Sequence, residues 1–361
     1  MDETILDRAR SGDGDAFEDL IAPYRRELLV HCYRSLGSIH DAEDVLQEVL
    51  VSAWRALDRF DGRSLRAWLY RIATNRCLNH LRDDARRPQA GNRPSENSGI
   101  GTADDPWWLE PFPDELLEAV EQGPEARYDA RESIALSFIA GLQQLPAQQR
   151  SVLVLRDVLG FPASEVADIL ATTTASVNSA LIRARDGFRP ERTPDLVPRP
   201  RSAEEASIVD RFVDAFQSGD LHSVLELLSD DARLSMPPEP IQCNGPQAIA
   251  DYLRWRGFWG PDLQLLPTRA NNQPAFGYYL PIPGASQSRA NGLIVLTIFD
   301  DHISTITRFG GPDIVARFGL PPTLDNNYKA RHEISGATGD SEPGPSGPMA
   351  MRRCGPRPRQ R

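Results

Sequence analysis

Two neighbouring segments with the same apolar spacing but opposite charge are the strongest constraint on the fold of this chain. Residues 41–50 read Asp-Ala-Glu-Asp-Val-Leu-Gln-Glu-Val-Leu, and residues 65–76 combine that spacing with arginine, tryptophan and tyrosine side chains. Apolar residues three and four positions apart are typical of a helix that buries one face. The pattern therefore predicts two helices in one compact unit, one acidic and the other basic and aromatic on its outer surface.

The net charge of the whole chain hides a strong local contrast. The chain has 51 acidic and 40 basic residues, which gives a formal charge of -11. Residues 59–87 nevertheless contain eight arginines and three acidic residues, whereas residues 96–125 contain nine acidic residues and neither arginine nor lysine. Because the local field steers a nucleic acid, residues 59–87 are the better candidate for contact with DNA.

A second motif lies at residues 162–188. Pro162 suits the first turn of a helix that continues over residues 165–170, and Thr173 suits the cap of a second helix, residues 174–188. Val177, Leu181 and Phe188 of the second helix are expected to face inward, which leaves its polar side chains for the major groove of DNA. These side chains are Ser176, Asn178, Ser179, Arg183 and Arg185. A helix pair that only packs is the alternative reading.

Composition divides the chain into six parts. Two helical domains and a later α+β domain are predicted, with an acidic linker, a Pro/Arg-rich linker and a disordered Pro/Gly/Ser-rich tail. In chain order the parts are residues 1–88, 89–126, 127–189, 190–203, 204–320 and 321–361. In the α+β domain, helices are predicted over 204–217 and 221–228, and strands near 232–236, 263–270, 275–282, 291–299 and 302–309.

Residues 40–86 resemble region 2 of an extracytoplasmic-function (ECF) sigma factor of the sigma-70 family, and residues 135–188 resemble region 4. The first resemblance is carried by Asp41-Ala-Glu-Asp and by Arg66-Ala-Trp-Leu-Tyr-Arg-Ile-Ala-Thr-Asn, and the second by the helix-turn-helix. It implies two all-α domains in a promoter-specificity subunit of RNA polymerase that has no catalytic activity. The implied partners are promoter DNA and the polymerase core, through its β′ clamp helices and β flap.

The resemblance also implies roles for particular residues of region 2. In this family the Asp-Ala-Glu-Asp helix binds the β′ clamp helices, so Asp44 and Gln47 are the predicted core-binding residues, with Asp41 and Glu48 as neighbours. From charge alone, a solvated acidic face is the alternative. Region 2 would hold unstacked bases of the -10 element, and region 4 would read the -35 element. The predicted -10 contacts are Phe60, Arg63, Tyr70, Arg71, Asn75 and Arg76, while Trp68 is expected to be core.

Residues 204–320 resemble the SnoaL-like, NTF2-type α+β cone, which a subgroup of these sigma factors carries at the C-terminus. The resemblance is carried by Ser235-Met-Pro-Pro, Arg269-Ala-Asn-Asn-Gln-Pro-Ala, Phe318-Gly-Leu-Pro-Pro-Thr-Leu and the linker segment Trp-Leu-Glu-Pro. Two adjacent tryptophans in a polar linker are expected to dock on another surface. The domain is expected to regulate the sigma domains in cis and to bind a small ligand. The predicted regulatory residues are Trp107, Trp108, Arg269, Asn271, Asn272 and Pro274.

Two other functions remain open at this point. A helix-turn-helix regulator that does not bind polymerase would leave the acidic helix and the basic helix unexplained. A SnoaL-type enzyme would need an acid-base pair from Asp220, His222, Asp300, Asp301 and His302. Asp220 is expected in a turn between helices and Asp300–Asp301 at the tip of a hairpin, and a fold does not by itself imply an activity.

No metal, cofactor or membrane is expected to take part. Cys77-x-x-His80 is a lone pair without the second pair that a zinc site needs. Four scattered cysteines, no signal peptide and no long apolar run together predict a protein of the reducing cytoplasm with free thiols.

Overall fold

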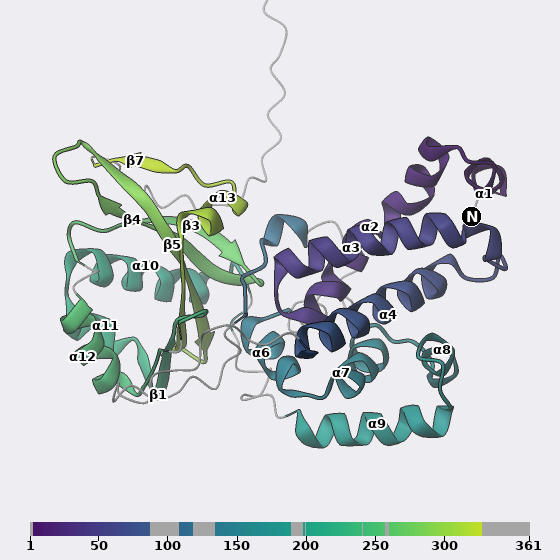
Figure 1. Cartoon of the computed structure of the whole chain (residues 1–361). Helices are drawn as coiled ribbons and strands as arrows, with labels where there is room; N and C mark the ends of the chain where they lie inside the picture. The colour runs from purple at the N-terminus through teal and green to yellow at the C-terminus, as the bar shows by residue number, and fades with distance from the viewer. Residues whose placement is uncertain are drawn as a thin grey trace, which may run out of the picture. The chain divides into compact units, whose positions relative to one another are not determined.

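The structure is a computed structural model of the chain, and it describes residues 3–86, 108–117, 134–188, 198, 200–239, 241–256 and 260–326 (Figure 1). These segments fall within one compact unit, residues 1–330. The predicted fold class is confirmed, because the unit contains two helical domains and one α+β domain with a mixed sheet.

The first helical domain confirms the predicted acidic and basic helices. It comprises α1 (Glu3–Arg10), α2 (Gly14–Leu36), α3 (Ile39–Ala56), the 3-10 helix η1 (Leu57–Arg59) and α4 (Leu65–Arg86). Gly37 ends α2 with a left-handed φ of 79°, and the Ser38 hydroxyl then accepts a hydrogen bond from the Asp41 N–H as the cap of α3. The chain therefore passes from one helix to the next within two residues.

The second helical domain contains the predicted helix-turn-helix. Its elements are α6 (Leu136–Gln144), α7 (Ala147–Leu153), the π-helical η3 (Val154–Val158), α8 (Ala163–Ile169) and α9 (Thr174–Gly187). The Thr173 hydroxyl accepts a hydrogen bond from the Ser176 N–H at 3.1 Å, so the predicted cap of α9 is confirmed. Val177 and Leu181 are buried against the rest of the domain, and Phe188 is half-buried, as their spacing predicts.

The α+β domain begins with α10 (Ala203–Ser218) and α11 (Leu221–Glu226), as predicted. Its larger strands are β1 (Leu228–Ser235), β3 (Gln264–Ala270), β4 (Gln273–Pro281), β5 (Gln287–Phe299) and β6 (His302–Gly310). They follow the sheet order β2-β1-β6-β5-β4-β3, in which only the β1–β6 pair is parallel among these neighbours. Four elements were not predicted: β2 (Gln242–Asn244), α12 (Pro246–Arg256), α13 (Pro312–Arg317) and β7 (Thr323–Asp325).

Both faces of this sheet are packed. One face supplies Phe276, Leu296 and Ile306 to the core of the α+β domain, which α10, α11 and α12 complete. Side chains of the opposite face belong to the buried cluster that also contains the cores of the two helical domains. They are Ala270, Ala275, Leu293, Val295 and Phe309. Because both faces are covered, residues 292–296 are all buried. In a sheet with one face in solvent, buried and exposed residues would alternate along the strand.

Candidate functional site

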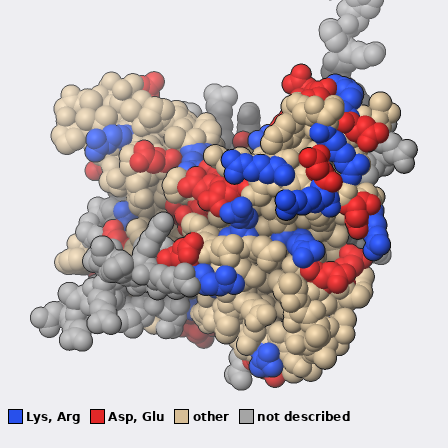
Figure 2. Space-filling model, turned by 45° about the vertical axis from the view of Figure 1, so that its right-hand side comes forward, with Lys and Arg blue, Asp and Glu red and all other residues tan. Residues whose placement is uncertain are grey.

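The outer face of α3 brings together the four predicted core-binding residues. Asp44, Gln47 and Glu48 are exposed, and Asp41 is partly exposed. Three of these carboxylates have nearby basic partners: Asp41 lies 3.8 Å from His80, Asp44 lies 3.9 Å from His40, and Glu48 lies 3.6 Å from Arg76. Exposed pairs of this kind are worth little and exchange easily for a stronger partner. Figure 2 shows acidic and basic side chains gathered side by side on one face of the protein.

Four of the six predicted -10 contacts lie at the surface, on α4 or on the loop before it. Arg63, Arg71 and Asn75 are exposed. Arg76 is partly exposed and donates a hydrogen bond to the Ser52 hydroxyl at 2.7 Å. The basic surface of α4 therefore lies next to the acidic surface of α3. The predicted DNA-binding and polymerase-binding residues of this domain are neighbours on its surface.

Phe60 and Tyr70 differ from the prediction, because both rings are buried. Phe60 packs on Trp68 with ring centroids 5.2 Å apart. Tyr70 is fully buried, and its ring centroid lies 5.2 Å from that of Phe161, in the loop before α8. The Arg66 guanidinium lies 4.9 Å from the Tyr70 ring and 4.8 Å from the Phe161 ring. In this structure Phe161, from the second helical domain, thus covers the Tyr70 ring, whereas Phe60 is buried against Trp68 within its own domain.

The predicted -35 residues lie on the exposed face of α9. Ser176, Asn178, Ser179 and Arg183 are exposed. Arg185 is also exposed, but its guanidinium forms a two-pronged ion pair with Asp157, at 2.7 and 2.8 Å. The structure thus places all five side chains on one helix, and a DNA contact by Arg185 would have to replace its bond to Asp157.

The linker segment 108–114 docks on the joint between α2 and α3. The Trp108 indole N–H donates a hydrogen bond to the Leu36 carbonyl at 3.1 Å. Glu110 Oε2 accepts hydrogen bonds from the Ser38 hydroxyl and from the His40 N–H, both at 3.0 Å. The carboxylate thus satisfies the His40 N–H in the first turn of α3 and lies at the positive end of the helix dipole. Docking was predicted for both tryptophans, but Trp107 lies outside the described residues.

Asn271, in the β3–β4 turn, joins that linker to both helical domains. Its Oδ1 accepts a hydrogen bond from the Phe112 N–H at 2.8 Å. Its Nδ2 donates to the Tyr33 hydroxyl at 2.9 Å and to the Ile134 carbonyl at 2.7 Å. The side chain is fully buried, so these bonds satisfy a group that would be costly to bury alone. We name Asn271 and its partners Tyr33, Phe112 and Ile134 the Asn271 junction.

The backbone of this turn is left-handed at two successive residues. Asn271 has a φ of 57° and Asn272 a φ of 59°, which are the torsions of a two-residue hairpin turn of the primed type. Asparagine tolerates this region better than most residues, although glycine fits it best. Both residues therefore adopt a backbone conformation in which glycine would carry less strain.

Arg269 secures the turn through a nearly buried ion cluster. Its guanidinium lies 3.2 Å from Asp114 and 2.7 Å from Glu205, and it donates to the Asn272 carbonyl at 2.7 Å. Asp114 also accepts a hydrogen bond from the Asn272 N–H at 2.7 Å. Burial raises the pKa of Asp114, while this hydrogen bond and Arg269 oppose that shift. Pro274, the last predicted regulatory residue, is buried beside the cluster.

Two further side chains that join the domains, Gln273 and Arg150, were not among the predicted site residues, although Gln273 lies inside the quoted segment 269–275. Gln273 Oε1 accepts a hydrogen bond from the Leu136 N–H at 2.9 Å, so a residue of the sheet caps α6. Arg150, in α7, donates to the Ser35 carbonyl of α2 and to Gln143 Oε1. Burial lowers the pKa of Arg150 to about 10, so it keeps its charge at neutral pH. In the sequence, polar residues of this kind cannot be distinguished from surface residues, because their hydrogen-bond partners lie in distant segments of the chain.

A further contact links the α+β domain directly to the acidic helix. Arg317, at the end of α13, donates a hydrogen bond to Glu43 of α3 at 2.8 Å. Phe318 follows and is buried in the cluster shared with the helical domains. The C-terminal domain therefore reaches the helix on which the predicted core-binding residues lie.

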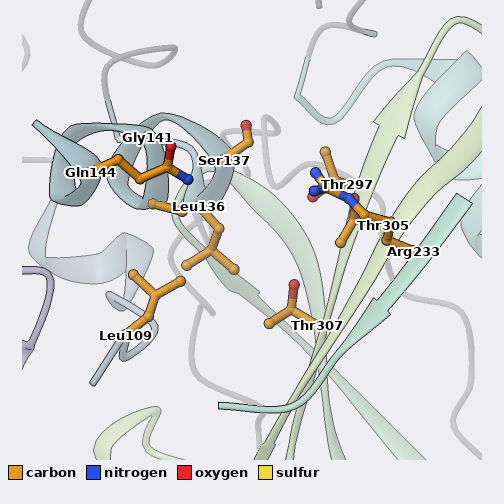
Figure 3. A pocket seen from close by; sticks show the side chains of 10 residues that line it. Leu109, Leu136, Ser137, Gly141, Gln144, Arg233, Thr297, Thr305 and Thr307 are labelled. Atoms are coloured by element: carbon orange, nitrogen blue, oxygen red, sulfur yellow. The ribbon is translucent and has the colours of Figure 1, made fainter. Parts of the chain in front are cut away.

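A small cavity separates α6 from the outer face of the sheet (Figure 3). Its volume is about 60 Å³. Its sheet side is polar and is formed by Arg233 of β1, Thr297 of β5, and Thr305 and Thr307 of β6. Leu109 and five residues of α6 line the opposite side: Leu136, Ser137, Ala140, Gly141 and Gln144.

The candidate catalytic groups lie apart from this cavity, on exposed turns. Asp220 caps α11 through the Ser223 N–H and hydroxyl, and His222 is exposed on that helix. Asp301 pairs with His302 at the β5–β6 hairpin tip. No group of three or more metal-ligating side chains occurs within the residues that the structure describes. In the same residues no helix is both long and apolar enough to cross a membrane.

Comparison with known proteins matches three parts of the chain to family models. Residues 20–87 match Sigma-70 region 2, residues 136–186 match Sigma-70 region 4, and residues 209–279 match a SnoaL-like domain. The ECF RNA polymerase sigma factor SigG of Mycobacterium tuberculosis is 39% identical over 324 residues, which cover 87% of this chain and 86% of SigG. This chain belongs to the ECF RNA polymerase sigma factors.

Two more comparisons show how the sigma factor is built. The RNA polymerase sigma-H factor of Pseudomonas aeruginosa is 34% identical over 189 residues, which cover 92% of that protein but 52% of this one. The crystal structure of the Mycobacterium tuberculosis ECF sigma factor SigJ has a TM-score of 0.57 and 22% identity, and the match covers 84% of this chain and 99% of SigJ. The two chains thus share a fold over most of their length.

Proposed function

We propose that this sigma factor binds the core of RNA polymerase, directs it to promoters, and is controlled in cis by its SnoaL-like domain. The observation that supports cis control best is the Asn271 junction. One buried side chain of the SnoaL-like domain bonds to α2, to the linker and to the segment that opens the second helical domain. A domain that merely followed the sigma domains along the chain would not need such a contact.

The proposed polymerase contact is the outer face of α3, which would bind the β′ clamp helices. Asp44 and Gln47 are its proposed centre, with Asp41 and Glu48 beside them. An exposed acidic face suits a basic partner because complementary charges increase both association and specificity. The second helical domain would bind the β flap, and the sigma factor would act in the cytoplasm.

The proposed promoter contacts lie on α4 for the -10 element and on α9 for the -35 element. The two elements are about two helical turns apart, roughly 70 Å along the duplex. In the structure, however, Tyr70 packs against Phe161, and Arg150 bonds to Ser35, so the two helical domains touch. We propose that these contacts must separate before both elements are read, and that separation would also expose Tyr70 to the melted strand.

The SnoaL-like domain would hold this closed arrangement. It restrains the linker at the Asn271 junction. Its Arg317 also forms an ion pair with Glu43, which lies next to the proposed polymerase contact. A small ligand would act most directly in the cavity between α6 and the sheet. Its binding there would alter the contact between the second helical domain and the SnoaL-like domain. Exposed turn positions of Asp220 and of the Asp301–His302 pair count against a SnoaL-type enzyme.

Reconstitution with purified core polymerase tests this function. Asp44→Arg places a positive charge against the basic clamp, and we expect at least a tenfold loss of core affinity. A surface change of this kind should alter stability by no more than about 0.5 kcal/mol. Asp19→Arg, a charge reversal at an exposed position of α2, is the matched control and should bind like the wild type. Equal core binding by both variants would contradict the proposed polymerase contact.

A further inference from the structure

The recognition helix α9 carries an exposed aliphatic side chain at the middle of its outer face. Ile182 is 61% exposed, whereas Val177, Leu181 and Ala184 of the same helix are buried. Single exposed apolar residues are common on proteins and need no explanation by themselves. The position of Ile182 among the proposed -35 contacts is what sets it apart.

Helical geometry places Ile182 one turn beyond Asn178 and Ser179, on the face that they share. It follows Asn178 by four residues and Ser179 by three, so the three side chains are surface neighbours. Each residue turns the helix by about 100°, which puts Ile182 angularly between the other two and away from the buried face. A surface laid along this face over Asn178 and Ser179 would therefore lie beside Ile182 as well.

The chemistry of these three side chains fits the major-groove edge of an A·T pair. Asparagine pairs with N6 and N7 of adenine, and the thymine edge presents a C5-methyl group that aliphatic side chains contact. We infer that Ile182 reads the methyl group of a thymine in the -35 element, beside the base pair that Asn178 contacts. This inference rests on the proposed binding of α9 to the -35 element and adds a base preference to it.

The surroundings of Ile182 favour DNA over a protein as the occupant of this face. Its exposed neighbours at three and four residues along α9 are Asn178, Ser179, Arg185 and Asp186, all polar or charged, so α9 supplies no continuous apolar area around Ile182. Protein interfaces have an apolar, fully desolvated centre, which one isoleucine among polar side chains does not supply. Asn178, Ser179 and Arg183 instead offer donors to bases and phosphates.

The test removes the methyl group from the DNA and the aliphatic side chain from the protein. Holoenzyme is reconstituted from the full-length chain and core polymerase on a promoter first identified by run-off transcription. Each thymine of its -35 element is replaced in turn by deoxyuridine, which lacks only the methyl group. With the wild type, we expect one position at which the replacement weakens binding roughly fourfold, the effect of burying about one methyl group.

Ile182→Ala should weaken binding to the thymine promoter and abolish the effect of deoxyuridine at that position. Arg183→Ala is the control: it should weaken binding while the deoxyuridine effect remains. The inference is overturned if Ile182→Ala keeps the deoxyuridine effect, or if no thymine shows one while the -35 region is protected from cleavage. Absence of any -35 protection by the wild-type holoenzyme would contradict the proposed function itself.

Discussion

The Asn271 amide of the β3–β4 turn donates a hydrogen bond of 2.9 Å to the Tyr33 hydroxyl of α2, across 238 residues of sequence. The Tyr33 hydroxyl in turn donates to the Glu110 carbonyl at 2.7 Å, and the rings of Tyr33 and Phe112 pack 4.8 Å apart. The first helical domain, the linker and the SnoaL-like domain thus meet at one pair of side chains. A change at this pair should act on all three.

Asn271→Gly should release the linker and increase transcription. Glycine suits the left-handed turn but leaves the Phe112 N–H and the Ile134 carbonyl without their partner, at about 1–3 kcal/mol for each buried group. We therefore expect a lower melting temperature and, because the closed arrangement is weakened, more run-off transcript at matched core occupancy.

Asn272→Gly is the matched control for that variant. Asn272 also has a positive φ, but its bonds to Asp114 and Arg269 are made by main-chain groups that glycine keeps. Its stability should be unchanged or raised by up to about 1 kcal/mol. Transcription that is unaltered in Asn271→Gly, or altered equally in both variants, would count against control through the Asn271 junction. Deletion of residues 204–361 is a weaker test, because it would also uncover the cluster that Phe309 shares with the helical domains.

Arg317→Glu should raise the affinity of the sigma factor for core polymerase. The change replaces an attraction to Glu43 by a repulsion and so moves α13 away from α3. An exposed ion pair is worth about 0.2–1 kcal/mol, so the expected gain is up to about fivefold. Titration of fluorescently labelled core measures it, with the exposed Arg289 of β5, changed to Glu, as the control. Unchanged affinity would show that α13 does not compete with the polymerase.

Asn75→Ala and Arg183→Ala should impair different steps of promoter opening. Asn75 is proposed to touch only the melted -10 strand, so its loss should reduce open complexes more than duplex binding. Arg183 is proposed to contact the -35 duplex, so its loss should reduce the first binding step. Permanganate footprinting reports melted thymines, and a gel-shift assay reports duplex binding. A loss of the same size at both steps for both variants would contradict this division.

The buried His31 should make stability depend on pH. Burial, with the charges of Arg34 and Arg66, lowers its pKa from 6.5 to about 3. Between these values the unfolded chain binds a proton that the folded protein does not, so stability is lost as the pH falls below 6.5. The slope contributed by His31 approaches about 1.4 kcal/mol per pH unit.

His31→Gln removes the titrating group and keeps a side chain that can hydrogen-bond the Thr74 hydroxyl, which lies 2.9 Å from His31 Nε2. Urea unfolding at pH 7 and pH 5 should therefore show a smaller loss of stability in the variant, by on the order of 1–2 kcal/mol. Parallel stability profiles of the two proteins would mean that His31 takes up its proton in the folded state as well.

Patterns confined to one helix or strand were readable from the sequence. The apolar spacing of Val45 and Val49 predicted α3, and Pro162 with Thr173 predicted the helix-turn-helix, because period and caps are local properties of a chain. The short strands β2 and β7 were missed, since three residues are too few to show a period. The helix α12 was missed although Ile249 and Leu253 lie on its buried side at helical spacing.

The sequence by itself also indicated which segments to consider for the site: the acidic helix α3, the basic helix α4, the second helix of the helix-turn-helix, α9, and the segment around Asn271. Only the tertiary structure decided which of those side chains are free. Tyr70 is covered by Phe161, Arg185 is paired with Asp157, and Glu43 with Arg317. The physical reason is that the exposure of a side chain, and the partner that satisfies it, depend on segments far away in the sequence. A local pattern of polarity shows which face a helix presents, but not what the folded chain places against that face.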